Sequence, residues 1–320
     1  MMDGNGSAGA SSADYPTHVH KWGCGWTKDC YALGRWVDGA TETDPGSWTT
    51  SSSSPEDGLL EHGIYYAAKD FWDERHGRRI QWGWAPLYTS SLALPREVRY
   101  DPRLQQLVFS PLAEQSLLRN GTIAQRTSVL LGPGVSVNLS ASAQSEAELK
   151  FSLPHEAVAL SAQLIAPSSD GDGSVQALTF GIEYSPPPSQ SEAAFHTVRV
   201  TGSSTAKPKA SGDRASSRPV ASTRFRTARE AEVEDWNFSS QLRLLPGEAE
   251  KELTLRLFFD HTIAEAYWQG RVAMTLPLST TNWAESGVEL VVAANTTASL
   301  SSANVWTVGS MWVTQQDVIG

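Results

Sequence analysis

Side chains that could hold a sugar gather between residues 61 and 84 of the chain. Glu61 stands in the sequence LEHG, Tyr65 and Tyr66 follow it, and Trp82 and Trp84 end the stretch RRIQWGW. Aromatic rings suit the apolar C–H faces of a sugar, and a carboxylate can accept two hydroxyl hydrogen bonds. We therefore predict that these five residues bind substrate. The alternative is that both tryptophans pack between sheets and that Glu61 only pairs with a polar neighbour.

Hydrolysis of a sugar would need more than these residues. A retaining glycosidase uses two carboxyl groups about 5–5.5 Å apart, one as nucleophile and one as general acid and base. Asp44 in TDPG and Asp101 in YDPR are the two carboxyl groups to consider. Asp followed by Pro is typical of a turn. We interpret both as turns and predict no catalytic residue in the chain.

A metal or cofactor site is a further possibility that the sequence argues against. Asp260, His261 and Glu265 in DHTIAEAYW resemble a metal-binding cluster. On a strand followed by a turn, however, Asp260 and His261 would point to different faces. Glycine-rich phosphate loops and GxSxG sequences are absent. We predict no metal site and no cofactor, and we interpret the isolated histidines, His62, His76, His155 and His196, as ordinary polar residues.

Short strands should position the candidate residues. Ile80, Trp82 and Trp84 alternate with polar residues, and residues 147–153 and 253–259 repeat this period of two. Such alternation is typical of half-buried strands, and glycines punctuate the segments as turns do. No segment has a long helical period. The pattern predicts an all-β fold made of antiparallel strands, such as a sandwich, a barrel or a propeller.

Composition narrows the class of protein. The chain has 320 residues, of which 40% are hydrophobic and 19% charged, enough for one large or two ordinary domains. Its net charge of −10 argues against a nucleic-acid partner, which needs a basic surface. No apolar run approaches the roughly 18 residues of a membrane span. We therefore predict no nucleic acid and no membrane span.

The first residues and the sequons point to different compartments. MMDGNGSAGASS lacks the basic and apolar segments of a signal peptide, so we predict a disordered tail over residues 1–14. Candidate N-glycosylation sites nevertheless occur at Asn5, Asn120, Asn138, Asn237 and Asn295, which would suit a secreted protein. The localisation stays open. Cys24 and Cys30 could pair, but we favour two separate buried thiols.

Domain organisation follows from shifts in composition. Tryptophan is dense from Trp22 to Trp84 and then absent until Trp236, which suggests a boundary at about residue 105. We predict one domain over residues 15–105 and a second over residues 106–320. The Ser-, Ala- and Arg-rich stretch near residues 201–230 is locally basic. We interpret it as a disordered surface insertion rather than a docking segment for an anionic partner.

Three stretches, in order, carry a resemblance to a known family. They are DGLLEHGIYYAAKDFWDERHGRRIQWGW, LALPREVRYDPRLQQLVFSPLAEQSLLR and LRLFFDHTIAEAYWQGRVAMTLPL, preceded by KDCYALGRW at residues 28–36. Together they resemble the invertases, or β-fructofuranosidases, of glycoside hydrolase family 32. The resemblance covers about residues 18–315. It implies that residues 15–105 are the last blades of an incomplete five-bladed β-propeller and that residues 106–320 are a C-terminal β-sandwich.

The resemblance also implies a function, namely hydrolysis of O-glycosyl bonds in β-fructosides such as sucrose or fructans. In the family, the hairpin that starts near Glu61 lines the edge of the sugar pocket, with an Asp where this chain has Glu61. The family's catalytic residues lie in sequences of the types NDPNG, RDP and EC, upstream of the stretches above, and none occurs here. We therefore expect the chain to be the C-terminal portion of such an enzyme and to be inactive alone.

Two other interpretations remain. The chain could be a non-catalytic sandwich that binds carbohydrate or associates with another subunit, or a degenerate paralogue without a binding role. A partial propeller would expose strand edges and apolar faces. We therefore expect either self-association or a missing N-terminal propeller part as partner. Family relatives are secreted, cell-wall or vacuolar, and their substrates are sucrose or fructans.

Overall fold

The described part of the chain has an all-β fold, as predicted. The computed structural model describes residues 16–25, 27–41, 43–52, 54–55, 58–86, 91–167, 175–187, 193–204, 236–261, 263–277 and 288–309. Their strands form four antiparallel sheets, accompanied by one short 3-10 helix, η1 (Ala113–Leu118), and one short α-helix, α1 (Glu248–Lys251). Within these residues, no helix is long and apolar enough to span a bilayer. The predicted tail over residues 1–14 lies outside the described residues.

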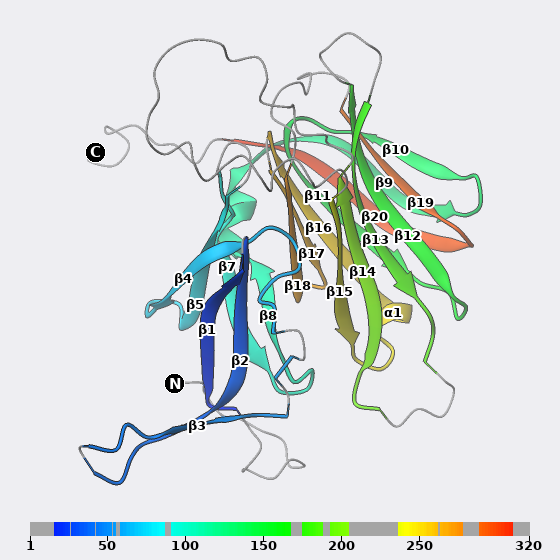
Figure 1. The fold of residues 1–320 in the computed structure, drawn as a ribbon. Coiled ribbons are helices and arrows are strands. Elements are labelled where there is room, and N and C mark those ends of the chain that lie inside the picture. The colour runs from blue at the N-terminus through cyan, green and yellow to red at the C-terminus, as the bar shows by residue number, and fades with distance from the viewer. Residues whose placement is uncertain are drawn as a thin grey trace, which may run out of the picture.

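The two smaller sheets come first in the chain (Figure 1). One contains β1 (His18–Gly25), β2 (Lys28–Val37) and β3 (Ser47–Thr50). The other contains β4 (Tyr66–Asp73), β5 (Arg78–Ala85), β7 (Arg96–Asp101) and β8 (Gln106–Pro111), with β6 (Ser91–Leu92) paired to β5. They pack on each other through buried residues such as Leu33 of β2 and Ala68 of β4.

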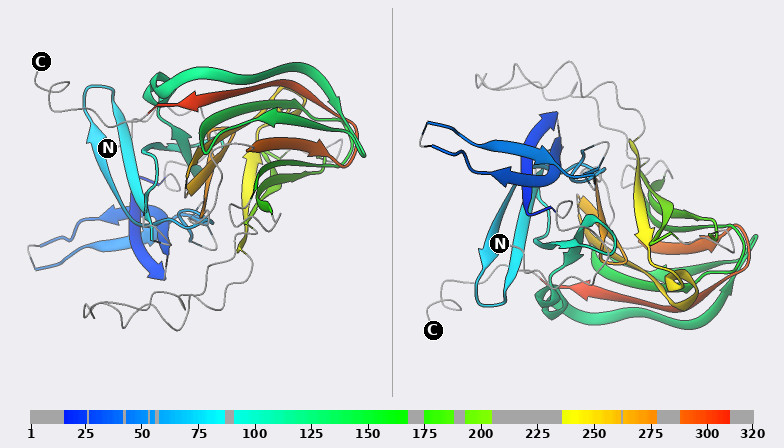
Figure 2. Two further views of the ribbon diagram at one scale, coloured as in Figure 1. Left: turned by 90° about the horizontal axis from the view of Figure 1, so that it is seen from above. Right: turned by 90° about the horizontal axis from the view of Figure 1, so that it is seen from below.

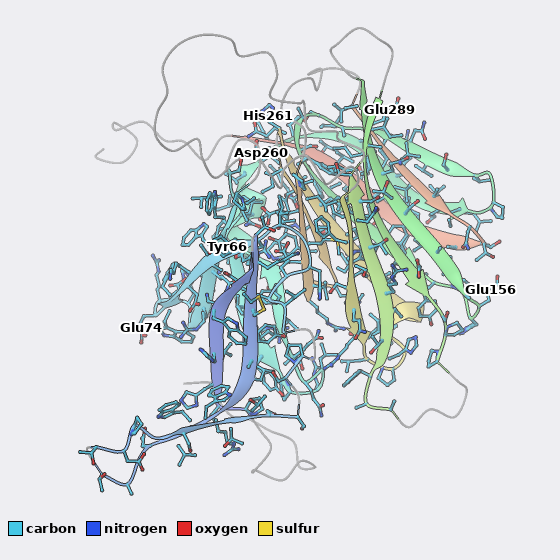
Figure 3. The ribbon with its side chains drawn as sticks, viewed as in Figure 1. Tyr66, Glu74, Glu156, Asp260, His261 and Glu289 are labelled. Carbon is cyan, nitrogen blue, oxygen red and sulfur yellow. A yellow bond between two sulfur atoms is a disulfide. The ribbon has the colours of Figure 1, made fainter. Side chains whose placement is uncertain are left out.

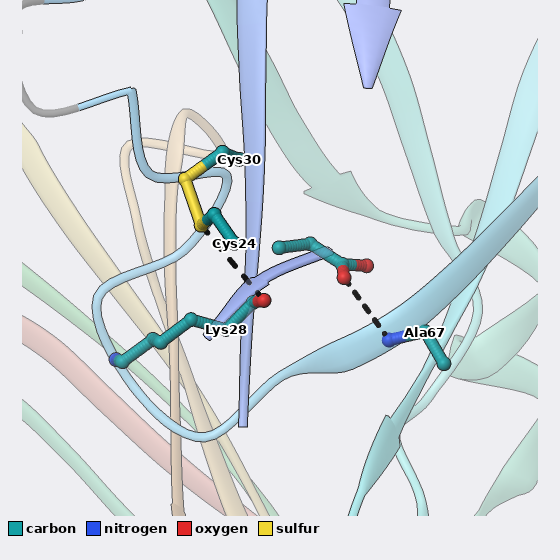
Figure 4. The surroundings of a disulfide bond; sticks show 5 residues. Cys24, Lys28, Cys30 and Ala67 are labelled. Atoms are coloured by element: carbon teal, nitrogen blue, oxygen red, sulfur yellow. Dashed lines mark hydrogen bonds between the residues drawn. A yellow bond between two sulfur atoms is a disulfide. The ribbon is translucent and has the colours of Figure 1, made fainter. Parts of the chain in front are cut away.

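Cys24 and Cys30 form a disulfide, so the prediction of two separate thiols is wrong (Figure 4). The antiparallel register of β1 and β2 pairs Trp22 with Cys30. This register places Cys24 at the bend of the hairpin, with its Cα atom 5.6 Å from that of Cys30. A separation of six residues cannot be judged from sequence without the hairpin register, and the register decides the pairing.

The two larger sheets have six strands each. Their orders are β10-β19-β12-β13-β14-β15 and β18-β17-β16-β11-β20-β9. One hydrophobic core draws on both, for example through Phe180 and Trp268, so the sheets pack face to face as a sandwich (Figure 2). The strands are β9 (Arg119–Leu131), β10 (Ser136–Ser140), β11 (Gln144–Ser152), β12 (Val158–Pro167), β13 (Val175–Tyr184), β14 (His196–Ser204), β15 (Trp236–Leu244), β16 (Leu253–Asp260), β17 (Ile263–Trp268), β18 (Val272–Pro277), β19 (Glu289–Ala294) and β20 (Ala298–Val308).

Two boundaries predicted from the sequence can be compared with the strands: the domain boundary near residue 105 and the start of the insertion near residue 201. β8 pairs with β7, and Asp101 lies opposite Gln106. Residue 105 lies in the turn of this hairpin, and the chain passes from the five-stranded sheet to the sandwich at η1. The domain boundary near residue 105 stays a prediction. β14 continues to Ser204, into the predicted insertion, whose remaining residues 205–230 lie outside the described part.

A packed junction joins the smaller sheets to the sandwich. β17 and β18 are buried on both faces. Their inner residues, such as Ala266 and Met274, belong to the sandwich core. Their outer residues, such as Tyr267 and Ala273, pack in one cluster with Tyr31 of the smaller sheets. The loop with Glu61, one of the predicted sugar-binding residues, lies in this junction.

Candidate functional site

Glu61 lies buried in the junction, in the loop before β4. Its Oε2 atom accepts a hydrogen bond from Nη1 of Arg96, and its Oε1 atom accepts one from the backbone N–H of Thr275 in β18. The loop around it is fixed further by Ile64, whose N–H donates to the Thr275 carbonyl at 2.9 Å. Glu61 therefore ties the smaller sheets to the sandwich.

Arg96 is the centre of this contact. Its Nη2 atom donates to Oε2 of Glu265 at 2.9 Å and to Oγ1 of Thr275 at 3.3 Å. Its guanidinium carbon lies 4.1 Å from the ring centre of Tyr65 and 5.4 Å from that of Tyr267. We call these residues the junction cluster: Glu61, Tyr65, Arg96, Glu265, Tyr267 and Thr275.

Glu265 is the second carboxylate of the junction cluster. Its Oε1 atom accepts from the backbone N–H of Leu94 at 2.6 Å, and its Oε2 atom also accepts from the Tyr267 hydroxyl at 2.8 Å. Together with Glu61, it shares the single guanidinium of Arg96, which is 1% exposed. Two carboxylates around one buried cation leave the cluster short of positive charge.

Burial sets the protonation of the cluster. It raises the pKa of Glu265; the nearby Arg96 charge opposes this effect, and the Glu61 charge adds to it. Burial likewise raises the pKa of Tyr65 and of Tyr267, so both phenols stay neutral. Although burial opposes its charge, the surrounding tyrosine and glutamate groups hold the pKa of Arg96 well above its usual value. The cation is thus permanent, and the raised pKa makes Glu265 easier to protonate in the folded protein.

The remaining candidate sugar-binding residues lie on the outer face of the β4–β5 hairpin. The Trp82 ring stacks on Phe71 with ring centres 5.5 Å apart, and Tyr66 lies 6.2 Å from Trp84. Tyr66 is labelled in Figure 3, whereas its neighbour Tyr65 is buried in the junction cluster. The structure divides the five predicted residues into a buried pair, Glu61 and Tyr65, and an outer group, Tyr66, Trp82 and Trp84.

A groove of about 890 Å³ opens between the smaller sheets and the β14–β15 edge of the sandwich. Tyr31 and Phe109 supply aromatic surface, while Thr197, Gln241 and Arg243 supply polar groups. At the groove wall, Arg243 donates from Nη1 to the carbonyl oxygens of residues 104 and 105, at 2.6 and 3.0 Å. Among the predicted residues, Glu61 also borders this groove. Its size and mixed lining suit a ligand with many hydroxyl groups.

Comparison with known proteins identifies the fold. The sequence profile described as "Glycosyl hydrolases family 32 C terminal" matches residues 113–307, more than half of the chain. The chain belongs to glycoside hydrolase family 32. The segments 28–36 and 57–84, which carry part of the family resemblance, lie outside this match. The 3-10 helix η1 and most of the sandwich lie inside it.

Individual relatives of this family 32 chain are longer. An acid β-fructofuranosidase of Solanum lycopersicum is 27% identical over 311 residues, which cover 88% of this chain and 46% of the relative. An acid β-fructofuranosidase of Vicia faba is 27% identical over 287 residues, which cover 79% of this chain and 41% of the relative. The chain thus spans less than half the length of these relatives.

A solved structure is similar in fold. Fructan 1-exohydrolase IIa from Cichorium intybus superposes with a TM-score of 0.60 at 17% identity, over 96% of this chain and 60% of that chain. A variant of the same chicory enzyme has been solved in complex with 1-kestose. At this identity the likeness shows the fold of the family 32 chain and nothing about its ligand.

The sequence pattern missed the partners of Glu61, although both lie in the motifs that carry the family resemblance. Arg96 stands in LPRE and Glu265 in DHTIAEAYW. They are 35 and 204 residues away from Glu61, and only the fold brings them together. The available signal was that Arg96 and Glu265 are charged residues in strand-forming sequence. A charge that is buried in a strand requires a partner of opposite charge.

The acidic motifs of the family 32 chain close turns. Asp44 accepts from the backbone N–H groups of Gly46 and Ala40, at 3.0 and 3.2 Å. Asp101 accepts from the N–H and the guanidinium of Arg103, at 3.0 and 3.1 Å. Asp260 and His261 lie at the end of β16, far from Tyr66, and His261 is in a turn with φ of 48° (Figure 3). In the described part of the chain, no three His, Cys, Asp or Glu side chains form a group that could hold a metal ion.

The described sequons lie on the surface of the sandwich. The exposed asparagines are Asn120 in β9, Asn138 in β10, Asn237 in β15 and Asn295 after β19. Asn295 also accepts a 2.7 Å hydrogen bond from the Ala159 N–H through its side-chain oxygen. Asn5 lies outside the described residues. Glycosylation at these positions stays a prediction.

We expect Glu265 to make the protein more stable at acidic pH than it would be without this group. Its pKa is raised in the folded state, so the folded protein binds this proton more tightly than the unfolded chain. The group therefore adds stability as the pH falls through its folded pKa, and this contribution is lost again as the pH rises. Other carboxylates with lowered pKa, such as Asp70 and Asp101, act in the opposite direction.

A comparison with Glu265→Gln isolates this effect. Urea unfolding of both proteins at about pH 7 and about pH 5 should show the native protein gaining free energy of unfolding relative to the variant on acidification. An equal difference between the two proteins at both pH values would contradict the assignment.

Proposed function

We propose that this family 32 chain is the C-terminal portion of a hydrolase of β-fructosides such as sucrose or fructan. We further propose that its two smaller sheets, up to about η1, are the last blades of a five-bladed propeller. The observation that supports this most is the extent of the match: 88% of the chain aligns with only 46% of the tomato acid β-fructofuranosidase. The stacking of two small sheets beside a sandwich supports the same assignment.

The chain's own residues supply support rather than chemistry in this proposal. Glu61 and Glu265 are two close carboxylates, but both bind Arg96 in the closed junction cluster. A carboxylate that accepts hydrogen bonds from a buried guanidinium is not free to act as nucleophile or general acid on a sugar. Their role is to hold the hairpin beginning at Tyr66 against the sandwich.

The test is an assay of fructose release from sucrose and from 1-kestose by the purified chain, with the tomato enzyme as positive control. We expect no fructose release above the blank. Glycosidases depend on paired carboxyl groups for rate enhancements on the order of 10⁶ or more. Fructose release at a rate within about a hundredfold of that of the tomato enzyme would overturn the proposal that this chain supplies support rather than catalytic residues.

A second function, binding of a fructan without hydrolysis, is favoured by the groove. Its aromatic and polar lining can contact both the C–H faces and the hydroxyl groups of a sugar chain. Glu61 and Tyr65 are committed to the junction cluster, so they would act there only by positioning the wall. Tyr66, Trp82 and Trp84, on the outer face, form the alternative sugar-binding surface that the sequence predicts.

Binding to inulin, measured by affinity electrophoresis, separates the two surfaces. Gln241→Ala should weaken inulin binding about tenfold by removing a hydrogen-bonding group from the groove, whereas Trp82→Ala should leave it unchanged. The reverse result would move the sugar site to the outer face of β4–β5. Inulin binding unaffected by either substitution would exclude both surfaces.

A further inference from the structure

The two cysteines of the chain close the β1–β2 hairpin at a weak point of its ladder. The register of the two strands is irregular between Gly23 and Gly25, and the paired positions skip Cys24 between them. A residue that is skipped in this way disrupts the hydrogen bonding between two strands. The bond from Cys24 to Cys30 therefore holds the hairpin together where the ladder does so least.

The two cysteines differ in their access to solvent. Cys24 is exposed, whereas Cys30 is 7% exposed, and its Sγ atom would lie 3.9 Å from a Cβ atom added at Gly58. A thiol that approaches from solvent therefore meets Cys24, and Cys30 is the sulfur that leaves. Because the chain has no third cysteine, the pair can open and close again without a wrong bond within the chain.

The start of β2, next to the disulfide, holds residues 58–68, which lead into β4 and which we call the Glu61 loop. The carbonyl oxygen of Asp29 accepts a hydrogen bond from the Leu60 N–H at 2.8 Å. The Asp29 carboxylate is buried and accepts from the N–H groups of Ala67 and Ala68, at 3.2 and 2.6 Å (Figure 4). Asp29 therefore fixes the Glu61 loop near both of its ends.

Lys28 extends this contact from the bend of the same hairpin (Figure 4). Its Nζ atom donates to the carbonyl oxygen of His62 at 2.7 Å and to that of Gly63. The same ammonium group lies 4.9 Å from the ring centre of Phe238 in β15. Lys28 thus joins the Glu61 loop to the strand that forms the opposite side of the groove.

The Glu61 loop is one wall of the groove, since its residues 59–62 line it. On the side of the sandwich, Glu61 and Ile64 bind the loop to Thr275 of β18. On the other side, the β1–β2 hairpin binds it through Asp29 and Lys28. The position of the wall is therefore fixed from two sides, and the disulfide closes one of them.

We propose that the Cys24–Cys30 bond is a site of thiol–disulfide exchange that controls the Glu61 loop and, with it, the width of the groove. The co-reactant is a dithiol. One of its sulfurs attacks Sγ of Cys24 as a thiolate, the S–S bond breaks, and Cys30 leaves as a thiolate that takes up a proton. The second sulfur of the dithiol then attacks the first, which releases Cys24 as a thiol and closes the dithiol into its own disulfide. Two electrons and two protons pass from the dithiol to the protein.

Opening the bond has a local effect. The two cysteines are six residues apart, and a loop this short restricts the unfolded chain less than a long loop does. Without the bond, the bend keeps only the irregular end of the ladder, so residues 27–29 gain freedom and their hydrogen bonds to the Glu61 loop open more often. β12 lies between β13 and β19 inside the sandwich and keeps its pairing.

Hydrogen exchange of the full 320-residue chain, before and after treatment with excess dithiothreitol, tests this control. Alkylation followed by mass spectrometry shows when both cysteines are free. In the reduced protein, the amides of Leu60 and Ala68 should exchange at least about tenfold faster, whereas amides of β12 should change less than about twofold. Treatment with oxidised glutathione should restore the original protection.

Cys24→Ser supplies the open state without a reductant. The serine replaces an exposed residue of nearly the same size, and a melting curve shows whether the variant is folded. Its Leu60 and Ala68 amides should exchange as they do in the reduced native protein. Dithiothreitol should not change them further, which also controls for effects of the reagent.

Three results would overturn the proposed exchange site. One is a disulfide that excess dithiothreitol does not reduce in the folded protein. Another is complete reduction without faster exchange at Leu60 and Ala68, which would make the bond a passive link. The third is faster exchange throughout the sandwich, which would make the bond a determinant of global stability. No sugar is present in these measurements, so their outcome is separate from that of the inulin and fructose-release assays.

Discussion

Replacing Arg96 with methionine is expected to lower the free energy of unfolding by about 3–5 kcal/mol. The Arg96 side chain is 1% exposed and binds both Glu61 and Glu265. Without it, two carboxylates remain buried side by side with no cation between them. A methionine fills much of the volume, so the loss measures charge rather than a cavity. Equilibrium unfolding in urea gives the value directly.

A matched control uses an ion pair at the surface. Arg199 pairs with Glu183 at 3.2 Å, and both side chains are more than half exposed. Arg199→Met should cost less than about 0.5 kcal/mol, because solvent screens such a pair. If Arg96→Met cost no more than this control, the junction cluster would not hold the sheets together. Adding Glu61→Gln and Glu265→Gln to Arg96→Met should restore part of the loss, because the unpaired charges are then removed.

Strand positions followed from the sequence where a strand has one buried and one solvated face. β11 and β16 were predicted because Leu149, Leu255 and Leu257 point into the sandwich core while their neighbours point outward. β17 has no such contrast: its six residues are all buried, since the smaller sheets cover the face that the core does not. Alternation of apolar and polar residues shows that one face of a strand meets solvent. It is therefore lost where both faces of a strand are covered by protein, as they are at the junction.

The same limit applies to the candidate site. From the sequence, Glu61 was expected to need a partner, and it has one. That partner is Arg96, on another strand, and the third member of the group, Glu265, lies 169 residues beyond Arg96. The sequence also could not separate Tyr65 from Tyr66. A β-bulge near Ala67, whose φ is 51°, sets the register between Tyr66 and Lys69, and neighbouring side chains point to opposite faces.

Tryptophan density, from which a domain boundary near residue 105 was predicted, follows the exposed surface rather than the strands of one sheet. Several of the tryptophans that end near position 84 are exposed, such as Trp22 and Trp82. The five-stranded sheet continues beyond them through β7 and β8, which carry no tryptophan. Composition therefore followed a surface, whereas the hydrogen bonding between strands continues to β8.

Adding a single methyl group at Gly63 should open the junction by a different route. A Cβ atom there would lie 2.1 Å from the carbonyl oxygen of Thr275 and 2.5 Å from its nitrogen. These are backbone atoms of a strand buried on both faces, so they cannot turn aside as a side chain would. Gly63→Ala must push the loop off β18, which breaks the hydrogen bonds of Glu61 and Ile64 to Thr275. We expect a loss of about 3 kcal/mol in the free energy of unfolding, at the upper end of overpacking costs.

Gly132→Ala is the matched control, because a Cβ atom at Gly132 would meet nothing within 4 Å. It should leave stability within about 0.5 kcal/mol of the native protein. Hydrogen exchange shows where Gly63→Ala acts: the Ile64 amide should lose protection while amides of core strands such as β12 keep theirs. Uniform loss across the sandwich would mean that the sheets unfold as one unit and that the junction has no separate opening. Selective loss at Ile64 would mean that the smaller sheets are held to the sandwich mainly through the contact of Gly63 and Glu61 with β18, so that the groove beside it can widen without unfolding the core.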